Sequence, residues 1–280
     1  MFKLFADSTI DLAPEQCEQL GVTTVPLTIH FGEQSYRDGV DMTHKEFYSR
    51  LRAADKLPTT SQVNPVQFED AFAPYLKKGE NIVVITISEK LSATYQSAKL
   101  VADANPGRVH VVDSSMASFG AQLLIYEAVR LRDAGTKTAA EAADALRSIV
   151  PRMRLYAVLD TLKYLRMGGR LSGGAALLGG ILGILPVVEV RDGVVTSVAK
   201  VRGDRAGMQT LLDFLEKMPP DPAYGICFGH ADDEARLEKY LTFLRPHLKG
   251  LAIRTSGLGS VIGTHTGPGI VGIAYVLAES

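Results

Sequence analysis

One histidine near the C-terminal end of the chain stands in the segment with the strongest chemical signal. Residues 263–269 read Gly-Thr-His-Thr-Gly-Pro-Gly, so His265 has a hydroxyl on each side and is surrounded by three glycines and a proline. These glycines and the proline disfavour helices and strands, which predicts a backbone that turns sharply or lets another group approach closely. An imidazole displayed in this way can act as a base or a nucleophile. A second interpretation stays open, in which His265 is a turn residue whose ring bonds a neighbouring carbonyl.

Small polar residues follow three apolar segments in the first half of the chain. They occupy residues 7–9, 88–94 and 113–115. If the apolar segments are parallel strands, these residues lie at the sheet edge where α/β proteins bind ligands. Ser92 precedes a helical pattern, and a hydroxyl beside a helix N-terminus suits a carboxylate or a phosphate. The alternative is that Ser92 only caps its own helix.

Two further groups of polar side chains allow two interpretations each. Thr60 and Ser61 lie just before the helical pattern at 65–77, where they can bind a ligand or serve as ordinary capping residues. Arg170 follows two glycines and Arg202 precedes one, and both can be solvated charges or anion-binding groups. The spacing of these residues does not decide between the alternatives.

The first half of the chain alternates apolar strands with amphipathic helices. Strands are predicted at 2–5, 23–31, 81–87 and 109–112, and helices at 14–20, 44–54, 65–77, 92–104, 117–134 and 139–148. Buried strands that alternate with helices indicate a parallel sheet covered on both faces. We therefore expect a doubly wound α/β domain over residues 1–152.

The pattern changes at Pro151, after which strands dominate. They are predicted at 155–159, 186–190, 194–201, 224–228, 251–255 and 270–276, with a helix at 233–244. Asp192-Gly193 between two of these strands is typical of a tight hairpin. The second half is therefore expected to be a smaller α+β domain, residues 153–280, with the ligand between the two domains.

The uncharged stretch from Leu171 to Val188 approaches the length of a membrane span. It contains five glycines and Pro186, however, and no second such stretch exists. We interpret it as a short buried helix near 175–182 followed by a strand.

Composition excludes several classes of function. Thirty basic and thirty-one acidic residues give a net charge of -1, which provides no general attraction to nucleic acid. Cys17 and Cys227 lie far apart, so they predict neither a disulfide framework nor a zinc site, and a reducing cytoplasm fits best. The N-terminus shows no signal peptide. The other histidines have no metal-ligand spacing, and no phosphate loop or Gly-x-Ser-x-Gly motif is present.

The motifs together resemble those of the DegV family of fatty-acid-binding proteins, and the resemblance runs nearly from end to end. The matching segments are 7–12, 60–62, 88–98, 112–114, 162–170, Arg202 and 263–269. Several motifs in the same order are far more specific than any one of them. Two positions depart from the family pattern: Ala93 stands where glycine is usual, and Val63 where proline is frequent.

The resemblance implies that two domains enclose one long-chain fatty acid in an apolar tunnel, without a metal or other cofactor. It implies that Thr60, Ser92 and His265, with Ser61 as a further member, hold the carboxylate. Arg170 and Arg202 match family arginines near the mouth of the site, where they would meet a partner or a phosphate.

The family also resembles the carrier subunit of bacterial fatty acid kinase. The chain would then have no catalytic machinery of its own and would present its ligand to a separate, dihydroxyacetone-kinase-like, ATP-dependent kinase. The acyl phosphate would serve phospholipid synthesis, with transient membrane contact for lipid exchange. Two alternatives stay open. One is an enzyme acting on a small phosphorylated or carbonyl substrate with His265 as base or nucleophile, and the other is a regulator that senses a lipid.

Overall fold

The first half of the chain forms a parallel sheet covered by helices on both faces. The computed structural model describes residues 2–173 and 183–279. The sheet has the order β2-β1-β6-β7, and every neighbouring pair is parallel. Its strands are β1 (Phe2–Asp7), β2 (Val22–Val25), β6 (Asn81–Thr86) and β7 (Val109–Asp113).

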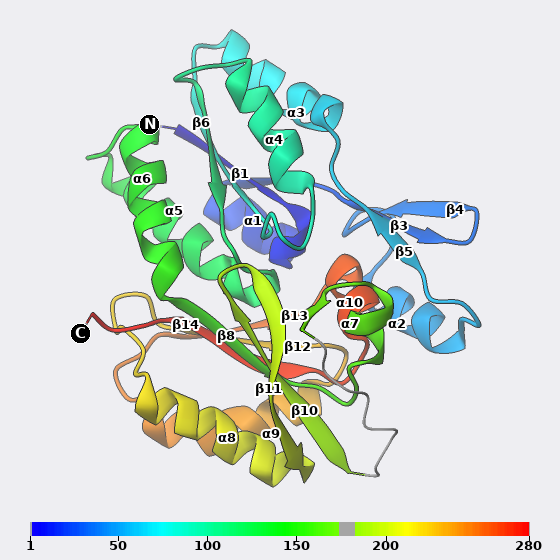
Figure 1. Cartoon of the computed structure of the whole chain (residues 1–280). Helices are drawn as coiled ribbons and strands as arrows, with labels where there is room; N and C mark the ends of the chain where they lie inside the picture. Colours follow the sequence, from blue (N-terminus) through cyan, green and yellow to red (C-terminus); the bar gives the residue numbers. More distant parts are fainter. Residues whose placement is uncertain (1, 174–182, 280) are drawn as a thin grey trace.

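The helices of this half are α1 (Pro14–Leu20), α2 (His44–Ala53), α3 (Pro65–Lys77), α4 (Thr94–Asp103), α5 (Gln122–Ala134) and α6 (Ala139–Ile149). Helices α3 and α4 lie on one side of the parallel sheet, and α5 and α6 lie on the other (Figure 1). The predicted doubly wound arrangement is therefore confirmed. It follows from strands whose side chains are buried on both faces.

The segment predicted as one strand over 23–31 belongs to two different sheets, so that prediction was wrong. Strand β2 ends at Val25, and β3 (Thr28–Phe31) joins β4 (Gln34–Arg37) and β5 (Thr59–Ser61) in a small antiparallel sheet of order β4-β3-β5. Pro26 lies between the strands and has no amide hydrogen to donate to a ladder. The small sheet places Thr60 beside the second half of the chain.

The second half forms a mixed sheet of seven strands, whereas the parallel sheet of the first half has four. Its order is β13-β12-β14-β8-β10-β11-β9. The strands are β8 (Met153–Val158), β9 (Leu171–Ser172), β10 (Ile184–Arg191), β11 (Val194–Arg202), β12 (Ile226–His230), β13 (Ile253–Gly257) and β14 (Val271–Val276). The helices are α7 (Lys163–Met167), α8 (Gly203–Lys217), α9 (Glu234–Leu244) and α10 (Ser260–Thr266).

The hairpin predicted at Asp192-Gly193 is confirmed. Arg191 pairs with Val194, which leaves two residues in the turn, and both have positive φ, 51° at Asp192 and 81° at Gly193. Such a turn follows the right-handed twist of the flanking strands.

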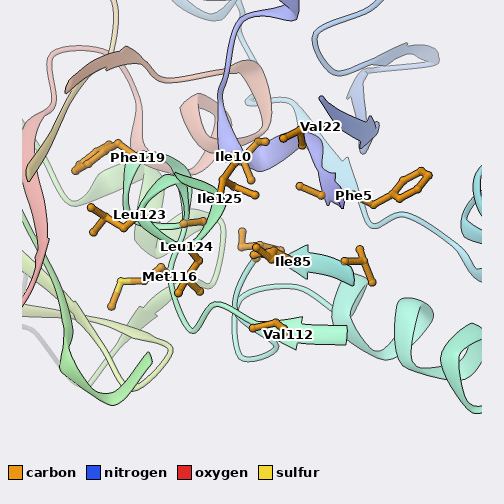
Figure 2. Close-up of a cluster of buried hydrophobic side chains, with 14 of the residues drawn as sticks. Phe5, Ile10, Val22, Ile85, Val112, Met116, Phe119, Leu123, Leu124 and Ile125 are labelled. Atoms are coloured by element: carbon orange, nitrogen blue, oxygen red, sulfur yellow. The ribbon is translucent and has the colours of Figure 1, made fainter. Parts of the chain in front are cut away.

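Alternate residues of the seven-stranded sheet face two different layers. On β8, Tyr156 and Val158 pack with α8 and α9, whereas Leu155 and Ala157 belong to the main core. That main core continues into the parallel sheet, and Figure 2 shows Ile85 and Val112 near Leu124 and Ile125 of α5. One apolar core therefore joins the two halves, and a domain boundary at residue 152 stays a prediction.

The stretch predicted as one helix over 117–134 is divided. It forms the 3-10 helix η2 (Ser118–Gly120) and then α5, with Ser118 at a φ of 51°. Short 3-10 helices also occur at η1 (Ser8–Ile10), η3 (Val150–Arg152) and η4 (Arg245–His247).

The helix predicted near 175–182 lies outside the described residues. None of the helices in the described part of the chain is long and apolar enough to cross a membrane.

Candidate functional site

A cavity of about 350 Å³ lies over one face of the seven-stranded sheet. On the sheet it is lined by side chains of β8, β10 and β11 and their ends: Leu155, Ala157, Leu159, Val188, Val190 and Val195. The opposite wall comes from the loop after β6, from η2 and from α10. Its size is that of a site for a small molecule, and its lining is mainly apolar.

The polar side chains of the cavity include those that the sequence singled out. Thr60, Ser61, Ser92, Arg170 and His265 all line it. They come from β5, the loop before α4, the segment before β9, and α10. The predicted residues are therefore brought together, although their roles as ligand contacts stay a prediction.

Arg202 lies elsewhere. It is the last residue of β11, it is exposed, and it is not among the described residues that line the cavity. It lies seven positions beyond the lining residue Val195 along the strand, which corresponds to about 23 Å.

His265 is held by a hydrogen bond to Thr60. Its Nε2 lies 2.9 Å from Oγ1 of Thr60, and its Nδ1 is buried without a hydrogen-bond partner among the described residues. A methyl group added to Gly168, at the end of α7, would overlap Nδ1. The ring is thus enclosed by α7 on one side and β5 on the other.

The glycine-rich segment around His265 is partly helical, which corrects the expectation drawn from its composition. Residues 260–266 form α10, with Gly263 inside the helix. A methyl group on Gly263 would lie 2.7 Å from Phe47 Cε1 and from the hydroxyl of Tyr48, both on α2. Glycine is present there because α2 and α10 pack closely, and Gly267 with a φ of 73° ends the helix.

His265 is neutral at physiological pH. Burial and the nearby positive charge of Arg170 lower its pKa to about 4. Arg170 itself donates from Nε to the Leu91 carbonyl at 3.1 Å and from Nη1 to the Gly168 carbonyl at 2.6 Å. Its guanidinium therefore links the loop of Ser92 with the segment that encloses His265.

Ser92 is not the N-cap of α4, contrary to the prediction. The helix begins at Thr94 with Ala93 as N-cap, and Ser92 Oγ accepts the Thr94 amide at 3.3 Å. The two hydroxyls lie 2.9 Å apart, and Thr94 Oγ1 also accepts the Val63 amide. Thr94 can therefore donate to Ser92, which leaves the Ser92 hydrogen free to donate into the cavity.

The Ser92 loop is also anchored to the hairpin between β10 and β11. Ser88 Oγ donates to the Gly193 carbonyl at 2.8 Å, and Lys90 Nζ donates to the Asp192 carbonyl at the same distance. The hairpin carries Val190 and Val195 of the cavity wall. These contacts fix the polar loop over the apolar part of the site.

Ser61 makes a different contact from the one expected of a ligand-binding hydroxyl. Its Oγ lies 2.7 Å from Nε2 of His30, whose Nδ1 lies 2.8 Å from Ser35 Oγ. The residue is exposed, although it borders the cavity. Its hydroxyl is thus occupied within the small sheet.

An outer groove borders the polar end of the cavity. Thr60, Arg170 and His265 line both this groove and the cavity. Lys56, in the segment before β5, and Lys163, on α7, line only the groove. Sequence reasoning missed the two lysines, since neither stands in a recognisable motif. The polar end of the cavity is therefore separated from the groove by a wall of side chains.

The other polar clusters predicted at the sheet edge serve mainly internal roles. Asp7 accepts hydrogen bonds from the Thr9 and Ile87 amides, and Asp113 accepts from the amides of Glu89 and Ser115. Neither aspartate is among the described residues that line the cavity. They shape the loops at the edge and do not point to a ligand.

Three buried carboxyl groups, Asp7, Asp11 and Asp38, lie behind the site, and sequence reasoning missed Asp38. Burial raises the pKa of Asp7 and of Asp38 to about 6 and holds that of Asp11 well above its ordinary value. Asp38 accepts from Ser8 Oγ at 2.8 Å and from the Ser260 amide at 3.2 Å, at the start of α10. The group supports the helix that carries His265. Among the described residues, no set of three or more His, Cys, Asp or Glu side chains could hold a metal ion.

Fold and cavity define an α/β protein with three sheets in its described part and a mainly apolar site that has polar side chains at one end. The chain belongs to the DegV family, whose model, described as an uncharacterised protein, matches residues 1–278. A DegV domain-containing protein of Caldanaerobacter subterraneus is 34% identical over 274 residues, 97% of each chain. One from Deinococcus radiodurans is 34% identical over 276 residues, 97% of this chain and 96% of that one.

Solved structures of similar proteins include fatty-acid-binding members. A DegV family protein from Thermus thermophilus, reported for its fatty acid binding, has a TM-score of 0.87 and 31% identity, with 99% of each chain covered. A stearic-acid-binding protein from Eubacterium ventriosum has a TM-score of 0.87 and 28% identity, covering 99% of this chain and 98% of that one. The chain thus shares the whole fold of relatives that bind long-chain fatty acids.

Proposed function

We propose that this protein binds one long-chain fatty acid and presents its carboxylate to a separate ATP-dependent kinase. The observation that carries the proposal is a mainly apolar cavity with Thr60, Ser92, Arg170 and His265 at one end, in a chain similar to fatty-acid-binding proteins. Burial of an acyl chain contributes about 0.8 kcal/mol per methylene, so the tail supplies affinity.

The head group is held by the hydroxyls of Thr60 and Ser92, each of which accepts a hydrogen bond from a neighbouring side chain. With Nε2 protonated, His265 donates to Thr60 Oγ1, and the Thr60 hydrogen then points to the carboxylate. Thr94 supports Ser92 in the same way. The charge of Arg170 near His265 adds electrostatic stabilisation. Such donors are needed because an unpaired buried carboxylate is costly.

The outer groove suits the carrier role because it reaches the residues that hold the carboxylate. A kinase docked there would contact Thr60, Arg170 and His265, which line both the groove and the cavity that holds the head group. The acyl phosphate formed would serve phospholipid synthesis, and ligand exchange would involve transient contact with a membrane. Arg202 is a proposed contact of the partner because it is exposed and away from the cavity.

Extraction of the natively purified protein with organic solvent, followed by mass spectrometry, tests fatty-acid binding. We expect about one equivalent of a long-chain fatty acid, and uptake of added palmitate by delipidated protein. The absence of both would overturn the proposal.

A second measurement separates the carrier from an enzyme. Protein incubated alone with palmitate and ATP is expected to form no acyl phosphate. Turnover without a partner would instead favour the enzyme hypothesis. In the described part of the chain, the hydrogen bonds of His265 include none to a carboxylate that would orient it as a base.

A further inference from the structure

The Phe119 ring lies in a slot formed by two glycines of the seven-stranded sheet. A methyl group on Gly229 of β12 would overlap the ring, and one on Gly272 of β14 would lie 2.9 Å from its Cζ. Phe119 is 1% exposed and lines the cavity. In Figure 2 its ring points away from Ile85 and Val112 of the parallel sheet. The ring thus fills space that any larger residue at the two glycines would occupy.

This slot lies where the cavity stops. Strands β12 and β14 follow β8 in the sheet order, and no residue of either strand is among the described residues that line the cavity. The polar end lies on the opposite side, since Arg170 directly precedes the edge strand β9 and Leu171 pairs with Val195 of β11. On the sheet, the lining therefore runs from β11 through β10 to β8, with Arg170 on the β9 side, and Phe119 covers the next two strands beyond β8.

Strand spacing gives the length scale of this arrangement. Neighbouring strands lie about 4.8 Å apart. An extended chain of single bonds advances about 1.2 Å per bond. The width of one strand is therefore equivalent to about four methylene groups, and removal of the ring would open the space above β14.

The geometry points to Phe119 as the residue that sets the maximum acyl chain length of the ligand. This inference rests on the proposed fatty-acid binding and adds its selectivity. The ring closes the far end of the cavity, opposite the head group, and Gly229 and Gly272 keep it there. Ligands longer than the cavity have to displace the ring from a slot in which it is closely packed.

Two substitutions test the inference in opposite directions. Phe119→Ala opens the slot above β14, so arachidate, with four more methylenes than palmitate, gains affinity relative to palmitate by about tenfold or more. Gly229→Ala displaces the ring toward the cavity, so affinity for palmitate falls relative to that for laurate by a similar factor. In the double variant the added methyl meets no ring, and the preference for short chains disappears.

The matched control is Phe228→Ala. Phe228 belongs to the same strand as Gly229 but packs in the core with α8 and α9. The Phe228→Ala substitution removes an equally buried ring that does not line the cavity. The preference between palmitate and arachidate is therefore expected to stay that of the wild type. Phe119→Leu, a milder change, is expected to shift the preference in the same direction as alanine and by less.

Dissociation constants for laurate, palmitate and arachidate, measured on delipidated protein, distinguish the outcomes. Unchanged preferences in Phe119→Leu, Phe119→Ala and Gly229→Ala would overturn the chain-length role and leave fatty-acid binding intact. A wild type that binds none of the three acids would instead overturn the proposed function. A shift of equal size in Phe228→Ala would show that lost packing, and not the position of the ring, causes the effect.

Discussion

Nε2 of His265 lies 2.9 Å from Oγ1 of Thr60, although 205 residues separate the two along the chain. The contact joins α10 of the second half to the small sheet of the first. It also separates the apolar cavity from the outer groove, since both residues line both spaces.

Loss of the two hydroxyls is expected to weaken fatty-acid binding. A hydrogen bond to a charged group contributes about 1.5–3 kcal/mol, so Thr60→Val and Ser92→Ala should each raise the dissociation constant for palmitate roughly tenfold to a hundredfold. Ser61→Ala is the control, because the Ser61 hydroxyl contacts His30. Titration calorimetry on delipidated protein measures all three, and an equal effect of Ser61→Ala would contradict these anchors.

A methyl group at residue 168 is expected to displace His265. In Gly168→Ala the added carbon overlaps Nδ1 of the ring, so the ring moves and its contact with Thr60 is lost. Overpacking of this kind costs about 1–3 kcal/mol, and palmitate affinity should fall with it. Gly257→Ala is the control, since its methyl would meet only His230 Nε2, at 3.7 Å. Equal affinities in the two variants would be inconsistent with the role of Gly168.

The low pKa of His265 makes stability depend on pH below neutrality. Its pKa is about 4 in the folded protein and near 6.5 when unfolded, so the unfolded chain binds more protons between these values. As pH falls from 6.5 to 4, the wild type should lose about 3 kcal/mol of stability relative to His265→Gln. Urea unfolding of both proteins across this range measures the difference. Parallel curves would show that the ring is not buried as described.

Asp38 predicts a pH dependence of the opposite sign. Its pKa is raised from 3.8 to about 6, so its contribution to stability is present below pH 3.8 and is lost as pH rises through 6. Between pH 4 and 7 the wild type should lose about 3 kcal/mol relative to Asp38→Asn. Asparagine can still accept from the Ser260 amide and can donate to Ser8 Oγ. The same unfolding experiment tests this, and a variant that is less stable than the wild type at pH 7 would contradict it.

Local sequence signals predicted much of the fold. Apolar runs such as residues 81–86 gave the parallel strands, and Asp192-Gly193 gave the hairpin. The single strand predicted over 23–31 was wrong at Pro26. A chain can continue through a proline in one strand or leave for another sheet, and which of the two occurs depends on pairing partners far away in the sequence. The helix of Gly263 was missed for the same reason, since packing against Phe47 and Tyr48 outweighs glycine's low helix propensity.

The candidate site was predictable as a set of residues and not as an arrangement. Ser92 and His265 stood out by type and by neighbours, but the contact of His265 with Thr60 depends on the tertiary fold. Phe119 gave no signal, because a phenylalanine among apolar residues is ordinary core composition. The buried position of Asp38 was equally hidden, since aspartate is usually exposed.

Strand β14 lies between β12 and β8, in the interior of the seven-stranded sheet, although it contains nearly the last residues that the structure describes. During synthesis, β8 cannot pair with β14 until residues 271–276 have left the ribosome. His265 on α10 and Gly272 of β14, against which the Phe119 ring packs, are also synthesised late. A nascent chain therefore has no finished cavity, and the proposed ligand would bind only after residues 271–276 have left the ribosome.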